Sequence, residues 1–136
     1  MEVPKDAIFQ RLKHSVQLLA SSPEIQLQLL PSFVCKADEL ARDFDLWQEV
    51  TLHNYRGDLN RSQLSALAAL DEKLGWLTHD GVKHWTDEAV RTSREWQDVR
   101  CLANRVLDAF GWPAETPPSY AHEYVGGKQP RSPNRN

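Results

Sequence analysis

Cysteine is scarce in this chain of 136 residues. Its two cysteines, Cys35 and Cys101, stand far apart and outside any CxxC or Cys/His spacing. This pattern argues against a disulfide scaffold and against a zinc knuckle. No motif places a base beside either thiol, so we expect both to be inert and either buried or half-exposed.

Long apolar runs are missing as well. No stretch of about 18 consecutive apolar residues occurs, which is the length that a membrane-spanning helix needs. Glu2 and Asp6 stand where a secretory signal would carry positive charge. We therefore expect neither membrane insertion nor export, and the default compartment is a reducing cytoplasm.

Motifs of nucleotide-dependent and hydrolase chemistry are absent: the sequence has no GxxxxGKS/T, GxGxxG or GxSxG. The one dense cluster of possible metal ligands is His79, Asp80 and His84, but no third ligand of suitable spacing accompanies the two histidines. We interpret these residues as structural or surface residues. A catalytic carboxylate pair would need an apolar pocket to raise one pKa, and an amphipathic helix does not provide one. We thus predict no catalytic residue, no metal and no cofactor.

Positive charge is in deficit. The chain has 16 basic and 19 acidic residues, a formal net charge of −3, so no global positive field exists to hold nucleic acid. Residues 36–50, KADELARDFDLWQEV, hold five acids and two bases. The net charge of this segment, −3, equals the net charge of the whole chain. A basic protein partner is easier to accommodate than a polyanion.

The dominant pattern in the sequence is helical. Apolar residues recur at a spacing of three to four from Ile8 to Leu19, which predicts a first helix from near Pro4 to near Ser21. Ser22 followed by Pro23 is typical of a capped helix start, and we expect the short helix EIQLQLL to end at Pro31.

The acidic segment belongs to a third predicted helix, residues 33–49. A helical wheel that starts at Phe33 gathers Ala37, Leu40, Phe44 and Trp47 on one apolar arc, which we expect to face the interior. On the same wheel the carboxylates of Asp38, Asp45 and Glu49 share one outward stripe.

Capping signals place the remaining helices. Asn60 predicts the start of a fourth helix, LNRSQLSALAALDEKL, and Gly75 is placed to end it in a left-handed conformation. A loop of residues 75–85 then leads to Thr86, the expected cap of a short helix. Thr92 and Glu95 fit a capping box for the last helix, which we expect to end at Gly111.

These elements predict an all-α single-domain bundle of five or six helices, residues 1–112. Residues 113–136 hold five of the eight prolines, two adjacent glycines and a basic end. That composition predicts an extended or disordered tail.

Tryptophan is the other notable feature, with five in a small domain. Trp76 and Trp85 flank the predicted Gly/His loop, where they would either pin the loop or anchor a partner. The candidate partner-binding residues are therefore Asp38, Glu39, Asp45, Glu49, Trp76 and Trp85.

In size, helical organisation and acidic patterning the chain resembles the small cytosolic immunity proteins that bacteria carry against secreted or contact-dependent toxins. The resemblance rests on LPSFVCKADELARDFDLW and WTDEAVRTSREWQDVR and is one of general type. It implies a one-to-one complex with a cognate basic toxin, with no turnover and no cofactor, and it assigns no binding residue.

An alternative function is a nucleic-acid-associated regulatory protein. It would contact phosphate through the basic tail and through Arg91, Arg94, Arg100 and Arg105. Acids lie between these arginines, at Glu95, Asp98 and Asp108, so pairing within the protein is the expected use.

Overall fold

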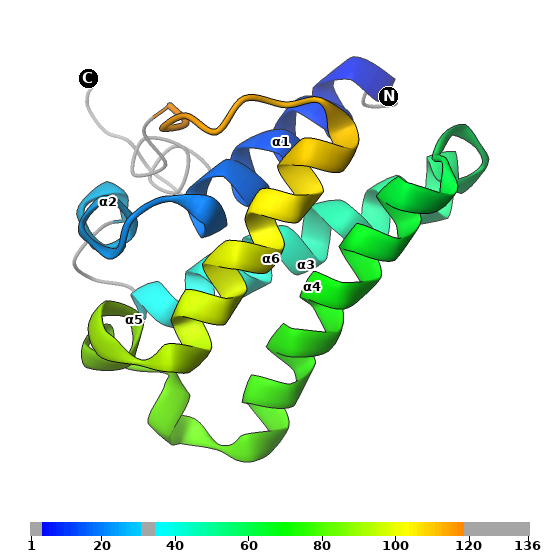
Figure 1. Ribbon diagram of the computed structural model, residues 1–136. Helices are drawn as coiled ribbons and strands as arrows, with labels where there is room; N and C mark the ends of the chain where they lie inside the picture. The colour runs from blue at the N-terminus through cyan, green and yellow to red at the C-terminus, as the bar shows by residue number, and fades with distance from the viewer. Residues whose placement is uncertain (1–3, 31–34, 119–136) are drawn as a thin grey trace, which may run out of the picture.

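The computed structural model describes residues 4–30 and 35–118, and in these ranges it has six α-helices, two short 3-10 helices and no strand (Figure 1). The elements are α1 (Lys5–Ala20), α2 (Pro23–Leu29), α3 (Lys36–Tyr55), η1 (Arg56–Asp58), α4 (Arg61–Asp80), η2 (Val82–His84), α5 (Asp87–Thr92) and α6 (Arg94–Phe110). The predicted all-α bundle is confirmed. Pro31 and Phe33 lie outside the described residues.

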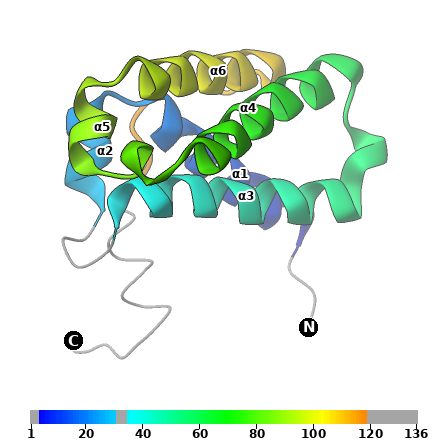
Figure 2. The same cartoon turned by 90° about the horizontal axis from the view of Figure 1, so that it is seen from below.

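The four long helices form the body of the bundle. α1 packs along both α3 and α6, and α6 packs along α4. α3 and α4 are consecutive in the chain, yet they meet only lightly. Figure 2 shows α4 crossing α3 obliquely and diverging from it toward the turn that joins them, while α2 and α5 lie together at one end. Of the long helices that follow one another in the chain, α3 and α4 are therefore the least tightly packed pair.

The core is built around two large aromatic side chains, Phe44 of α3 and Trp96 of α6, both fully buried. The predicted apolar stripe of α1 is also inside, since Leu12, Val16 and Leu19 have no exposed surface. Burying a side chain of this size contributes roughly 1.5–3 kcal/mol. These contacts explain why α1, α3 and α6 hold together along their length.

Both ends of the first predicted helix are confirmed, and so are four capped helix ends. The side chains of Ser22 and Thr86 accept hydrogen bonds from backbone N–H groups at the starts of α2 and α5. Asn60 and Gln63 form a reciprocal capping box at the start of α4, with both hydrogen bonds 2.8 Å long. Gly111 ends α6 in the left-handed conformation, with φ of 70°.

Three predicted helix ends are wrong. The third predicted helix does not end at Glu49, because α3 continues to Tyr55. Gly75 does not end α4, which continues to Asp80 and is followed by Gly81 at φ of 127°. The predicted loop of residues 75–85 is therefore shorter by six residues, because Gly75 to Asp80 are helical. The last helix is capped by Ser93 and not by Thr92, which is the final residue of α5 and donates its hydroxyl to the Glu88 carbonyl.

Part of the predicted tail is described. Residues 113–118 have no regular secondary structure and run back past α1 in Figure 1. Gln17 of α1 donates a hydrogen bond to the Pro113 carbonyl at 2.9 Å, and Pro117 is buried. These six residues thus pack on the helical domain, and residues 119–136 lie outside the described part.

Candidate functional site

The candidate site is a groove along the lightly packed side of the bundle, between α3 and α4. Asp38, Asp45 and Glu49 line it from α3. Asp71 and Gly75 line it from α4. The predicted outward stripe of α3 thus faces a second helix across a groove. We call this surface the acidic groove.

The groove holds two hollows that share Asp45 and Asp71. The first hollow has a volume of about 230 Å³, and its lining includes the apolar side chains of Ala41, Phe44 and Leu74. Three acidic residues, one arginine, one threonine, one tryptophan and one glycine complete its wall. A cationic group with an apolar stem would find both an apolar lining and counter-charges here.

The second hollow, of about 450 Å³, extends toward the end of α3, where Glu49, His53 and Arg56 line it. Gln48 is almost fully buried at its edge, and its Nε2 donates to Asp71 Oδ1 at 2.6 Å. This bond links α3 to α4 and fixes the orientation of the Asp71 carboxylate.

Asp71 is the site residue that sequence reasoning missed. It follows LSALAAL, and no local pattern connects it with the acids of α3. The available signal was its helical spacing: Asp71, Leu74, Gly75 and Thr78 share one face of α4. Only the packing of α4 shows that this face is turned toward α3.

The acidic groove carries an excess of negative charge, with four carboxylates against the guanidinium groups of Arg42 and Arg56. Arg42 lies 3.4 Å from Asp38, and both side chains are substantially exposed, so this pair contributes little, at most about 1 kcal/mol. Asp45 and Glu49 form no ion pair with any other described residue. Within the described part of the chain, no ion pair therefore compensates their charge. Glu39, also predicted to bind a partner, lines neither hollow.

The two predicted partner-binding tryptophans differ in position. Trp85 lines the first hollow and packs edge-on against Trp96, with ring centroids 5.7 Å apart. Trp76 lies outside the groove on another face of α4, with 46% of its surface exposed. The Lys73 ammonium sits over the Trp76 ring at 4.9 Å, and Lys73 in turn pairs with Glu95 at 2.8 Å. The hydrogen bond from Lys73 to Glu95 raises the pKa of Lys73 above its ordinary value.

The cluster of His79, Asp80 and His84 is divided between a structural pair and one exposed histidine. His84 is buried, and its Nε2 lies 2.8 Å from Asp80 Oδ2. Its backbone carbonyl accepts a hydrogen bond from Trp96 Nε1 at 2.7 Å. The hydrogen bond with His84 lowers the pKa of Asp80. In the described ranges, no three His, Cys, Asp or Glu side chains are grouped so that they could hold a metal ion.

Both cysteines, which we expected to be buried or half-exposed, are exposed. Cys35 precedes α3, and its sulfur lies 3.7 Å from the Trp85 carbonyl oxygen. Cys101 lies on the outer face of α6. Neither thiol lines the acidic groove.

The arginines of the alternative function are used differently from one another. Arg91 pairs with Glu88 at 3.1 Å on the surface of α5. Arg100 extends into the interior, where Nη1 donates to Gln26 Oε1 at 2.9 Å and to the Val90 carbonyl at 3.2 Å. Arg100 is thus part of the packing between helices, and its guanidinium is not offered to phosphate.

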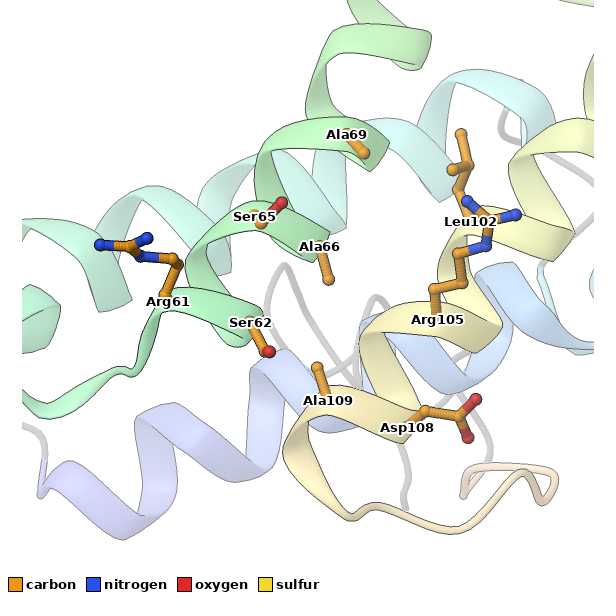
Figure 3. Close-up of a pocket in the computed structure, with 9 residues that line it drawn as sticks. All are labelled: Arg61, Ser62, Ser65, Ala66, Ala69, Leu102, Arg105, Asp108 and Ala109. Atoms are coloured by element: carbon orange, nitrogen blue, oxygen red, sulfur yellow. The ribbon is translucent and has the colours of Figure 1, made fainter.

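A larger hollow of about 610 Å³ lies between α4 and α6 (Figure 3). Small side chains from both helices line most of it, among them Ser65, Ala66 and Ala109. Arg61, at its edge, points away from Ser62 and Ala109. This hollow lacks the dense charge of one sign that distinguishes the acidic groove.

No helix in the described part of the chain is both long enough and apolar enough to cross a lipid bilayer.

Comparisons with known proteins do not add to these observations. The chain matches no protein-family model, no curated protein and no solved structure.

Proposed function

We propose that this chain is a non-catalytic binding protein that receives a basic protein partner in the acidic groove. The observation that carries this proposal is the placement of four carboxylates along the one pair of consecutive long helices that packs lightly. An uncompensated acidic surface attracts a cationic partner over a distance, speeds the encounter and rejects acidic proteins.

The kind of partner follows from the sequence resemblance to toxin-immunity proteins. Nucleases are basic where they bind the phosphate backbone, and a row of carboxylates occupies such a surface in place of the phosphates. The proposed activity is therefore one-to-one inhibition of a basic toxin in the bacterial cytoplasm. The complex would require no cofactor, because inhibition needs only a covered surface.

The proposal is tested with the product of the neighbouring gene, provided that this gene encodes a large secreted protein with a variable C-terminal domain. The variant replaces Asp38, Asp45 and Glu49 by Lys, and calorimetric titration measures the affinity at low salt. We expect a loss of about 2–5 kcal/mol in binding free energy, which is typical when charges meet bases at a desolvated interface.

The matched control changes the net charge equally at another place. Glu72, Asp108 and Glu115 are exposed acids outside both hollows of the groove, and their replacement by Lys alters the chain by the same six charges. This control should lower the affinity far less than the groove variant does. Equal losses would mean that net charge alone attracts the partner, and an unchanged affinity of the groove variant would remove the acidic groove from the interface.

The alternative, phosphate binding through arginines, is not favoured by the geometry. Arg100 and Arg91 already have partners within the fold. A steep salt dependence of RNA or DNA binding, lost on deletion of residues 113–136, would be needed to revive it.

A further inference from the structure

Gly75 is an unusual residue for the middle of a long helix. α4 continues for five residues beyond it, and its φ is not among the positive φ values, which occur only at Gly81 and Gly111 in the described residues. A Cβ atom built at Gly75 meets no atom within 4 Å. Neither the backbone conformation nor crowding therefore requires glycine, although glycine in a helix interior is destabilising.

The consequence of glycine at this position is the shape of the first hollow. Gly75 forms part of its wall between Leu74 and Thr78, and any larger residue would project a side chain into open space there. The absence of a side chain thus keeps the hollow accessible from the α4 side.

The lining of this hollow defines the group that fits it. Ala41 and Trp85, both partly exposed, supply apolar surface, and Asp38, Asp45 and Asp71 supply carboxylates on both helices. A long side chain with an apolar stem and a cationic end satisfies both parts of the lining. The protein's own Arg42 also lines the hollow, where its side chain is 72% exposed and lies 3.4 Å from Asp38.

We propose that the first hollow receives an arginine side chain of the basic partner, inserted beside Gly75 between α3 and α4. This inference rests on the proposed function and adds a specific contact to it. Arginine fits better than lysine, because its planar guanidinium donates to carboxylates on different sides at once. It is also more weakly hydrated than an ammonium, and Trp85 offers an aromatic ring against which it can lie.

The test uses two peptides of equal length and charge, (Arg-Gly)₄ and (Lys-Gly)₄, titrated into the full chain and followed by amide and indole NMR signals. The arginine peptide should bind more tightly and should shift the Gly75 amide and the Trp85 indole most strongly. The decisive variant is Gly75→Leu, which fills the hollow without changing any charge. It should lower the affinity for the arginine peptide by about tenfold, the loss expected when one charge-assisted contact is removed.

Two control variants show whether a loss of binding comes from filling the first hollow or from another effect of the substitution. Gly75→Ala adds only a Cβ atom to the hollow and should weaken binding of the arginine peptide less than Gly75→Leu does. Ala68→Leu places the same leucine on an exposed position of α4 that lines neither hollow of the groove, and it should also bind normally. If Gly75→Leu does not fold, as judged by circular dichroism, Thr78→Leu fills the same hollow one turn further along and replaces it.

The outcomes distinguish this inference from the function on which it rests. Weaker arginine binding by Gly75→Leu but not by Ala68→Leu supports insertion beside Gly75. Unchanged binding by Gly75→Leu, together with weaker binding by the Asp38, Asp45 and Glu49 reversal variant, overturns insertion and leaves the proposed function in place. Unchanged binding by both variants overturns both, and equal affinity for the two peptides overturns the preference for arginine.

Discussion

Replacing Arg100 by Met tests whether this arginine of α6 serves the packing between helices or a phosphate-binding surface. One guanidinium nitrogen of Arg100 donates to Gln26 Oε1 at 2.9 Å and to the Val90 carbonyl at 3.2 Å. Gln26 is fully buried, and its own Nε2 donates to the carbonyls of Leu18 and Leu19. Through this network, Arg100 connects α6 with the ends of α1, α2 and α5. Burial lowers the pKa of Arg100, although the group stays charged at neutral pH.

The expected effect follows from the bonds that are lost. Methionine preserves much of the stem volume but donates no hydrogen bond. Hydrogen bonds to charged groups contribute about 1.5–3 kcal/mol, and leaving the buried Gln26 oxygen without a donor costs a further ~1–3 kcal/mol. Relief from burying the guanidinium charge offsets part of this loss. We therefore expect the free energy of unfolding to fall by about 2–3 kcal/mol.

Urea denaturation at neutral pH, followed by far-ultraviolet circular dichroism, measures this change. Arg105→Met is the matched control, because Arg105 is an exposed arginine of α6 that bonds to no other described residue. Its replacement should alter stability by no more than about 0.5 kcal/mol. If Arg100→Met were as stable as this control, the interior role of Arg100 would be refuted. If Arg100→Met in addition abolished salt-dependent binding to RNA, the alternative function would gain support.

Two further predictions concern stability. Gly75→Ala should raise the free energy of unfolding by roughly 0.5–1 kcal/mol, because alanine loses less backbone entropy in a helix; a lower melting temperature would contradict this. The hydrogen bond with His84 lowers the pKa of Asp80, so the ionised carboxylate stabilises the fold above its unfolded-state pKa, and this contribution is lost as the pH falls through the folded-state pKa. Asp80→Asn should therefore lose less stability on acidification than the wild type does, as measured by urea midpoints across the acid range, and parallel curves for the two proteins would refute this role.

Much of the fold could be predicted because its signals are local. A side chain that caps a helix acts within three or four residues, so Ser22, Asn60 and Thr86 could be identified without knowledge of the rest of the molecule. Gly111 could be identified in the same way from the Trp and Pro that follow it. The helix-wheel positions of Asp45 and Glu49 likewise placed them on the outward face of α3, and both are exposed.

The errors arose where two local solutions compete and distant contacts select one. Thr92 and Ser93 are both suitable caps for α6, and Ser93 is used because α5 includes Thr92. Glu95, expected to reach back to the start of its own helix, instead pairs with Lys73 of α4. At Gly75, helix termination and helix continuation were both possible. Continuation buries Leu77 completely, which contributes roughly 1.5–3 kcal/mol and outweighs the cost of a glycine within the helix, about 1 kcal/mol.

The sequence by itself determined that the chain folds into helices with one acidic outward stripe on α3, because helical periodicity and capping depend on near neighbours. Only the tertiary structure decided that this stripe faces α4 across an open groove, with Asp71 and Gly75 on the opposite side. Which helices pack closely depends on how side chains far apart in the chain fit together. Here α1 packs along α3 and α6 packs along α4, whereas the contact between α3 and α4 is light.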